Sequence, residues 1–265
     1  MDSYLQLKDL SLTYHTKDGE VKALDNISFS VKKNEFVTIV GPSGCGKTTI
    51  LSLIAGLLKQ TSGELLLEGN PIVKGLDTGY MFQKDHLFEW RTIYKNLILG
   101  LEIKGKTKDK ECLERVDDLL KKYGLYEFKD CYPYQLSGGM RQRAALIRTL
   151  SLRPKLLLLD EPFSALDYQT KLNVCDDVHS IITNEKQTVI AVTHDISEAI
   201  SMSDRIIILT NRPAKVKKIQ NIELQDIKTP LKRRESGEFS KYFDLIWREL
   251  SNEKKDASEK LFSGT

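Results

Sequence analysis

The stretch Phe36-Val-Thr-Ile-Val-Gly-Pro-Ser-Gly-Cys-Gly-Lys-Thr-Thr49 decides the fold of this chain. An apolar run of strand length, residues 36–40, is joined to a helical run by a loop of the form Gly-x-x-x-x-Gly-Lys-Thr. Glycines in such a loop let backbone amides surround phosphate oxygens, and the helix N-terminus favours their negative charge. The stretch therefore predicts a phosphate-binding loop. The alternative is a glycine-rich turn that only joins a strand to a helix.

The phosphate loop predicts the contacts of a bound nucleotide. Lys47 would neutralise the β- and γ-phosphates, and the Thr48 hydroxyl would ligate magnesium. The other loop residues expected to contact the nucleotide are Gly41, Pro42, Ser43, Gly44, Cys45, Gly46 and Thr49. Cys45 can also be interpreted as a nucleophile, but no base is evident, and a side chain that faces away from the nucleotide is the simpler interpretation.

Two carboxylates follow a second apolar run. Residues 156–159 are four leucines, and Asp160 and Glu161 come directly after them. The carboxyl ends of buried parallel strands are where such folds bind ligands. We predict that Asp160 holds the magnesium, usually through water, and that Glu161 polarises a water placed in line with the γ-phosphate. Helix capping by two acids is the structural alternative.

A further polar residue lies near a predicted strand end. His194 follows the apolar run 189–192 and could contact the γ-phosphate or the attacking water. A lone histidine is more often structural than catalytic.

The stretch Ser137-Gly-Gly-Met-Arg-Gln-Arg143, called here the signature segment, has the features of a second anion-binding helix start. It offers a small capping residue, two glycines and then residues that favour helix. However, it contains no lysine, and the phosphate loop is already complete without it.

The pattern of apolar residues predicts an α/β fold. Continuous apolar runs at 36–40, 156–159, 189–192 and 206–209 are separated by helical segments, as expected for parallel strands buried on both faces of a doubly wound core. The first part of the chain instead alternates apolar and polar residues, which indicates an antiparallel, half-exposed sheet. Strand patterns disappear between about 85 and 150, where a helical subdomain is predicted to be inserted.

Helices are predicted in the inserted region and near the C-terminus. Residues 108–123 form a charged amphipathic pattern with Cys112, Val116, Leu119 and Leu120 on its apolar side. Residues 1–225 are predicted to form one unit, and 226–265 a C-terminal extension. After residue 213 we expect irregular, basic chain, then one helix at 239–250, and a disordered last dozen residues. The apolar stripe of that helix is predicted to be Phe243, Ile246, Trp247 and Leu250. The basic run 228–234 is either a solvated surface or a contact with lipid headgroups.

Composition and sequence pattern argue against a nucleic-acid-binding, zinc-binding, secreted or membrane-spanning protein. The chain has 265 residues with 40 basic and 37 acidic side chains, a net charge of +3, which gives no long-range attraction to nucleic acid. Its 4 cysteines lack metal-binding spacing, so reduced thiols in a cytosol are expected. The longest apolar runs have strand length, and the N-terminus lacks the pattern of a signal peptide. Any link with a membrane would go through a partner.

The ordered motifs together resemble the ATP-binding subunit of an ABC transporter. Residues 41–48 match the Walker A motif, and residues 156–160 match Walker B, followed by Glu161 as the catalytic glutamate. The signature segment matches the family's signature motif, except that Met140 stands where glutamine is commonest. The remaining matches are the Q-loop at Gln83, the D-loop at 164–167 with Asp167, the switch histidine at His194, and the adenine-stacking aromatic at Tyr14. The Q-loop match implies that Gln83, at the start of the segment leading into the helical region, reaches the magnesium or the attacking water and couples hydrolysis to transport.

The resemblance implies both a fold and an activity. The implied fold is a P-loop NTPase (RecA-like) core with an antiparallel β subdomain and an inserted α-helical subdomain. The implied activity is ATP hydrolysis with Mg2+ in a head-to-tail dimer of two copies. In that dimer Ser137, Gly138 and Gly139 would donate hydrogen bonds to the γ-phosphate held by the partner copy, using the helix dipole in place of a lysine.

A finer resemblance is to the nitrate, sulfonate and taurine branch of bacterial importers. It rests on residues 83–92, 167–171 and 211–213, with departures at Glu89 and Ala214. It implies integral membrane permease subunits that dock near Gln83 to Trp90, an extracytoplasmic solute-binding protein as an indirect partner, no nucleic acid, and a peripheral position at the cytoplasmic face of the cell membrane. The alternative for 87–90 is that these side chains only fill the core of the helical subdomain.

Other members of the superfamily remain alternatives. These are the ATPase subunit of an exporter or lipoprotein-releasing complex, a soluble ABC ATPase that acts on ribosomes or DNA, and a non-catalytic regulatory cassette. The transported substrate does not touch this subunit in the expected arrangement, so the sequence leaves it open.

Overall fold

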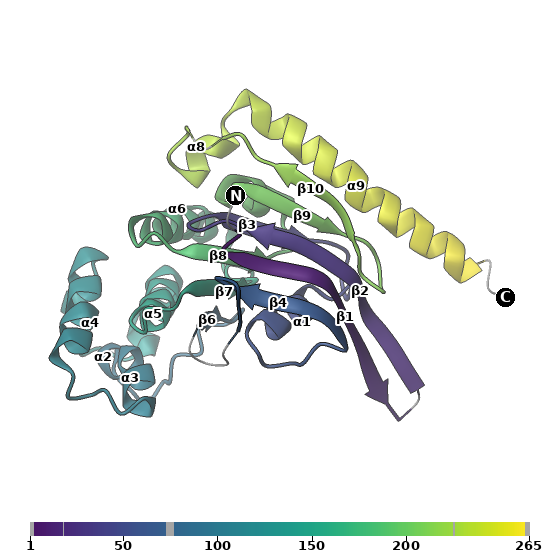
Figure 1. Cartoon of the computed structure of the whole chain (residues 1–265). Coiled ribbons are helices and arrows are strands. Elements are labelled where there is room, and N and C mark those ends of the chain that lie inside the picture. Colours follow the sequence, from purple (N-terminus) through teal and green to yellow (C-terminus); the bar gives the residue numbers. More distant parts are fainter. Residues whose placement is uncertain (1–2, 18, 73–76, 225, 263–265) are drawn as a thin grey trace.

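The computed structural model describes residues 3–17, 19–72, 77–224 and 226–262. A large mixed sheet forms the centre of the molecule, and a smaller antiparallel sheet lies beside it (Figure 1). The strand order of the large sheet is β10-β9-β3-β8-β7-β6. Its strands are β3 (Phe36–Val40), β6 (Thr78–Met81), β7 (Leu156–Asp160), β8 (Thr188–Val192), β9 (Arg205–Leu209) and β10 (Val216–Asn221). All neighbouring pairs are parallel except β10 with β9.

The continuous apolar runs arise because the large sheet is covered on both faces. In β7, Leu157 and Leu159 pack with helices α5 (Gly138–Leu150) and α6 (Tyr168–Asn184), whereas Leu156 and Leu158 pack on the opposite side with α1 (Lys47–Ile54). Alternating side chains of a strand point to opposite faces, so every position must be apolar when both faces are buried. The doubly wound α/β core is thus confirmed.

The antiparallel sheet covers the α1 side of the core. Its strand order is β2-β1-β4-β5, and Leu5 of β1 pairs with Val31 of β2 and Leu67 of β4. The strands are β1 (Leu5–Thr16), β2 (Gly19–Val31), β4 (Ser62–Leu67) and β5 (Asn70–Pro71). Fully buried leucines and isoleucines of β1 and β2 share one cluster with α1, as expected from their alternating pattern.

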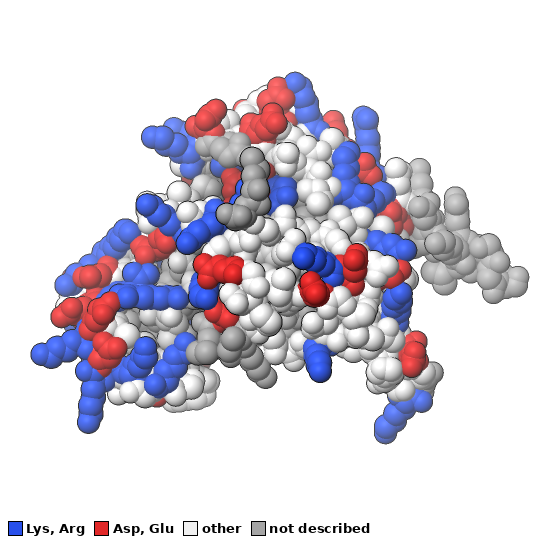
Figure 2. Space-filling view, viewed as in Figure 1, with Lys and Arg blue, Asp and Glu red and all other residues white. Residues whose placement is uncertain are grey.

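The predicted helical subdomain lies between β6 and β7, at the left of Figure 1. Its elements are α2 (Ile93–Leu97), α3 (Leu99–Ile103), α4 (Lys110–Lys122), the 3-10 turns Tyr126–Phe128 and Pro133–Gln135, and α5. Helix α4 is capped by Asp109 and buries Val116, Leu119 and Leu120. Lysine, arginine, aspartate and glutamate side chains are interleaved over the outer surface of this region (Figure 2), so the amphipathic pattern separates core from solvent.

The C-terminal part corrects three expectations. Irregular chain after 213 is wrong for Val216–Asn221, which forms the lysine-rich edge strand β10, whereas the described residues between β10 and residue 230 form no helix or strand. The extension holds two helices among its described residues, α8 (Pro230–Arg234) and α9 (Gly237–Phe262), where the sequence predicted one. Helix α9 continues to Phe262, so a disordered last dozen is wrong for 254–262, and 263–265 lie outside the described residues.

The extension packs against the core. Ile246 of α9 is fully buried in a cluster with Val40 and Ile206 of the sheet, whereas Trp247 of the predicted apolar stripe is 54% exposed. The predicted apolar stripe is therefore correct for Ile246, whereas Trp247 lies at its solvent-exposed margin. Within the described residues, no helix is both long enough and apolar enough to cross a membrane.

Candidate active site

The order of the central strands brings the predicted site residues to one edge. Strands β3, β8, β7 and β6 are consecutive and parallel, so the segments that follow them lie side by side at their carboxyl ends. These segments are the phosphate loop, the His194 loop, the pair Asp160–Glu161, and the segment that begins with Gln83. Residues separated by more than a hundred positions are thereby collected at one place.

The phosphate loop leads directly into helix α1. Gly44 and Gly46 have φ values of 72° and 123°, backbone conformations that side chains rarely tolerate. Lys47 is only 8% exposed, and its ammonium donates hydrogen bonds to the carbonyls of Gly41 (2.9 Å) and Pro42 (3.0 Å). Because carbonyl partners do not neutralise the ammonium, its charge is available to an anion on the loop.

Cys45 belongs to the core rather than to the reacting surface. Its side chain is 1% exposed and packs with the apolar cluster of α1 and β1. Burial raises the pKa of its thiol, which disfavours the thiolate needed for nucleophilic attack. A Cβ atom on Gly41 would lie 2.9 Å from Cys45 Sγ, so the glycine and the inward cysteine fit together.

Asp160 is held beside the phosphate loop by two hydroxyls. Its carboxylate accepts hydrogen bonds from Thr48 Oγ1 at 3.2 Å and from Tyr80 Oη at 2.9 Å. Burial raises the pKa of Asp160, although the Tyr80 and Thr48 hydrogen bonds and the Lys47 charge oppose the rise. Burial, together with the Asp160 charge, also raises the pKa of Tyr80, which keeps this phenol a hydrogen-bond donor.

Glu161 and His194 form a pair. Oε2 of Glu161 lies 3.1 Å from Nδ1 of His194, and the two side chains are 25% and 66% exposed. Glu161 has a φ of 48°, a left-handed conformation that is uncommon for a residue with a long side chain. This strained turn directs the carboxylate toward His194. A carboxylate in contact with an imidazole at the edge of a phosphate loop can polarise a water for attack on phosphorus.

Gln83, Tyr14 and Asp167 take separate places around this edge. Gln83 is exposed just beyond β6. The phenol of Tyr14, on β1, lies 3.3 Å from Oγ1 of Thr49 in the first turn of α1. Asp167 caps helix α6 by accepting a hydrogen bond from the Thr170 amide at 3.0 Å. Tyr14 therefore lies close to the phosphate loop, and Asp167 organises a helix start.

The signature segment lies apart from the phosphate loop of the same chain. Ser137 caps α5 by accepting from the Met140 amide at 3.3 Å, so its hydroxyl proton stays free to donate. A Cβ on Gly138 would lie 3.1 Å from a Leu166 methyl, and one on Gly139 2.7 Å from a Val174 methyl. Between Ser137–Gly139 and the loop 41–48 the described residues make no hydrogen bond. In the described part of the chain, no hydrogen bond therefore joins the two glycine-containing helix starts.

The donor set at Thr48 and Asp160 fits magnesium. Both are hard oxygen donors that lie 3.2 Å apart at the edge of the phosphate loop, and Mg2+ prefers a few such donors completed by water and phosphate oxygens. When bound, the ion supplies charge that stabilises the phosphates during transfer.

A model of the ABC transporter family matches residues 24–164. The chain belongs to the ABC transporter family. Over 250 residues it is 45% identical to an uncharacterized ABC transporter ATP-binding protein of Methanocaldococcus jannaschii, covering 94% of this chain and 92% of that protein. Over 266 residues it is 38% identical to the nitrate import ATP-binding protein NrtD of Synechocystis, covering 98% and 100%.

Solved structures agree on the fold. The dimeric ATP-binding cassette MJ0796, in a post-hydrolysis state with ADP and Pi, matches with a TM-score of 0.68 and 31% identity, over 83% of this chain and 99% of that one. The P-loop NTPase fold is therefore confirmed, and this ABC transporter chain is an ATPase whose hydrolysis is coupled to transport.

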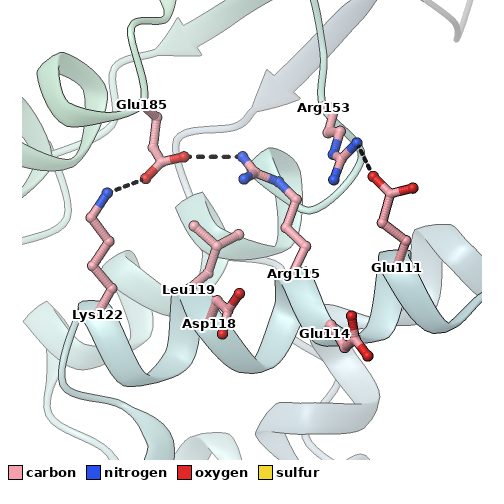
Figure 3. Close-up of a pocket in the computed structure, with 8 residues that line it drawn as sticks. All are labelled: Glu111, Glu114, Arg115, Asp118, Leu119, Lys122, Arg153 and Glu185. Atoms are coloured by element: carbon pink, nitrogen blue, oxygen red, sulfur yellow. Dashed lines mark hydrogen bonds and ion pairs between the residues drawn. The ribbon is translucent and has the colours of Figure 1, made fainter.

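A separate cavity of about 310 Å³ in this ABC transporter chain is lined by residues of α4 together with Arg153 and Glu185 (Figure 3), and no residue of the phosphate loop lines it. Glu185, which follows α6, points into it and bonds Lys122 at 2.7 Å and Arg115 at 3.1 Å, both on α4. Arg153 pairs with Glu111 at 2.7 Å on the other side. These ion pairs tie α4 to the core, so the cavity is a structural junction rather than a second reacting centre.

Two residues near the site were missed by the sequence analysis. Tyr80 holds Asp160, but it lies within β6 and belongs to no motif. Arg212 donates a hydrogen bond to the carbonyl of Gly44 at 2.8 Å and so ties the segment after β9 to the phosphate loop. The sequence marks Arg212 only as part of the resemblance to the importer branch. Because Arg212 lies 168 positions from Gly44, no local pattern indicates their contact.

Proposed function

We propose that this chain is the ATP-hydrolysing subunit of a bacterial-type importer that takes up a small anion or organic solute of the nitrate, sulfonate or taurine type through a membrane permease. The nitrate import relative supports this proposal, because it aligns over 98% of this chain and the whole of its own length. The residues that mark the branch in the sequence support it independently. The unit 1–225 would act as the cassette, with 226–265 as its C-terminal extension.

The observation that carries the catalytic part is the Glu161–His194 pair at the end of β7 and β8. With ATP on the phosphate loop, Glu161 accepts a proton from the attacking water, and His194 orients that water or contacts the γ-phosphate. Lys47 neutralises the phosphates, Thr48 and Asp160 hold Mg2+, and Gln83 senses the state of the site. Tyr14 stacks on the adenine.

A second copy of the chain completes each site. Ser137 and the amides of Gly138 and Gly139 form a helix start able to donate to a phosphate, and among the described residues no hydrogen bond joins them to the phosphate loop of their own chain. In a head-to-tail dimer they contact the γ-phosphate bound by the other copy. The dimeric state of the solved cassette MJ0796 supports this arrangement.

The segment after Gln83 is the proposed docking site for the permease. Leu87 is buried at 6% exposure in the helical subdomain, whereas Trp90 is 75% exposed and Phe88 37%, with ring centroids 4.8 Å apart. Leu87 therefore fills the core of the helical subdomain, whereas Phe88 and Trp90 are exposed and available for docking. The exposed aromatic pair is held by Asn96, which is fully buried and bonds the amide and carbonyl of Phe88, and it suits a short apolar helix of a membrane subunit at the cytoplasmic face.

Purification with the native permease tests the function. A tagged chain isolated from membranes of its own organism is expected to bring down an integral membrane protein, and Trp90→Ala is expected to lose it while keeping the ATPase rate of the free subunit. Leu57→Ala, at another exposed apolar position, is the matched control. The purified complex in proteoliposomes should take up solute in the presence of its solute-binding protein. ATP-driven efflux, or association with ribosomes instead of a membrane protein, would contradict the proposal.

A further inference from the structure

A buried charge cluster lies next to the catalytic pair without being part of it. Lys171 of α6 places its ammonium 2.7 Å from Asp195 Oδ2 and 2.9 Å from Glu198 Oε2. The Lys171 side chain is 13% exposed and that of Glu198 only 5%. Asp195 and Glu198 belong to the start of α7 (Ile196–Met202), so the ammonium joins two helices.

Each end of this cluster leads to a proposed site residue. Lys171 lies in the first turn of α6, where its amide donates to the carbonyl of Asp167 at 2.9 Å. Asp195 directly follows His194, and its carboxylate caps α7 by accepting from the Glu198 amide at 3.1 Å. Lys171 is therefore the side chain that connects the D-loop end of α6 with the loop that carries His194.

The Lys171 ammonium balances the negative charge of Asp195 and Glu198. Burial alone would lower the pKa of Lys171, but the carboxylates of Glu198 and Asp195 more than offset this and raise it, so the ammonium stays charged. Glu198 is shielded from water, whereas the Asp195 side chain beside it is 33% exposed, and without a counter-charge the two carboxylates would repel each other. Burial would raise the pKa of Asp195, but the hydrogen bonds from Lys171 and the Glu198 amide, with the charges of Lys171 and of Arg234 on α8, lower it.

We propose that Lys171 is a positioning residue for ATP hydrolysis: it holds the Asp195 loop against α6 and thereby keeps the His194 imidazole at Glu161. The proposal rests on the proposed roles of His194 and Glu161. It predicts an effect on turnover and none on nucleotide binding, because Lys171 makes no contact with the phosphate loop among the described residues.

The test compares Lys171→Met with Arg205→Met in the full chain. Arg205 forms a similarly shielded ion pair with Glu35 at 2.9 Å, but at the opposite end of the sheet. We expect Lys171→Met to lower kcat by about 10-fold to 100-fold through misplacement of His194, with an unchanged Kd for ATP. Arg205→Met should lower the melting temperature and leave kcat unchanged. Lys171→Arg should restore most of the turnover.

A double-mutant cycle separates positioning from general stability. If Lys171 acts through His194, adding Lys171→Met to His194→Ala should lower kcat no further than His194→Ala alone. Multiplicative losses, or an unchanged kcat in Lys171→Met, would overturn the proposal. If Lys171→Met does not fold, Lys171→Met with Glu198→Gln removes one charge of each sign, and the same loss of kcat is expected.

The cycle also distinguishes the two proposals. A His194→Ala variant with wild-type turnover would remove the proposed role of His194, and the Lys171 proposal with it. A His194→Ala variant that loses turnover while Lys171→Met keeps it would overturn only the role of Lys171.

Discussion

Helices α1 and α5 both begin with glycine and a polar residue, yet their surroundings differ. The start of α1 lies at the carboxyl ends of parallel strands, carries the buried Lys47, and faces Asp160 through Thr48. The start of α5 lies in the helical subdomain, with its glycines against Leu166 and Val174. The start of α1 is surrounded by cation, acid and hydroxyl groups from its own chain. The start of α5 presents backbone amides and Ser137, and the nearby Arg141 guanidinium pairs with Asp85 at 3.1 Å.

The difference teaches how one site can be divided between two copies. A lysine at the start of α5 would add a second ammonium beside a phosphate that Lys47 already neutralises, whereas amides stabilise the same charge through the helix dipole. In the proposed head-to-tail dimer, the start of α5 would be completed by the nucleotide bound to the other copy. Substitutions near the two helix starts should therefore affect nucleotide binding and hydrolysis differently.

The largest effect is expected at the proposed catalytic pair, Glu161 and His194. Glu161→Gln keeps the shape of the side chain but removes its ability to accept a proton, so we expect kcat to fall by about 10²-fold to 10⁴-fold. ATP binding should remain, and the closed dimer should accumulate, which size-exclusion chromatography with ATP measures. A normal hydrolysis rate would show that Glu161 is not the base.

Lys47→Ala should weaken nucleotide binding itself. Charge-assisted hydrogen bonds contribute roughly 1.5–3 kcal/mol each, so losing those of Lys47 to two phosphates should raise the Kd for ATP by about 100-fold or more. Titration with a fluorescent ATP analogue measures this in the monomer. Normal affinity would contradict the assignment of the phosphate loop.

Much of this site could be predicted from the sequence because its parts are local. A phosphate loop, an acidic pair after a leucine run and a glycine-rich helix start each need only a few consecutive residues, and strand order then collects them. What could not be predicted depends on long-range packing. Tyr80 at Asp160 and Lys171 at Glu198 are joined across 80 and 27 positions, and neither belongs to a pattern with a fixed spacing.

The C-terminal errors have a related cause. Strand β10 contains two lysines and no fully buried residue, so its sequence does not show the apolar pattern of a strand. Helix α8 has five residues, too few for an apolar period to be visible. Such elements are stabilised by contacts such as those of Arg233 with the carbonyls of Ser201 and Ser203, which sequence alone does not display.

Ser137→Arg should separate the two helix starts. We expect it to leave ATP binding by the monomer unchanged and to lower hydrolysis by about 100-fold, because a donor to the γ-phosphate is lost and a long side chain fills its place. Mixing it with Lys47→Ala subunits should recover about a quarter of the wild-type rate, since half of the dimers are mixed and each keeps one intact site. No recovery on mixing would contradict the head-to-tail dimer.

The smallest effect is expected from the packing of α5 against α6, which involves Gly139 and Val174 and not the nucleotide. A Cβ on Gly139 would meet the Val174 methyl at 2.7 Å, so Gly139→Ala should lower the free energy of unfolding by about 1–3 kcal/mol through overpacking. Val174→Ala in the same chain should relieve the contact and restore the melting temperature of Gly139→Ala toward that of Val174→Ala alone. Hydrolysis should recover with it, because an alanine amide still donates to phosphate. If stability recovers and hydrolysis does not, the glycine is required at the nucleotide itself, and the start of α5 depends on close backbone approach as strongly as the phosphate loop does.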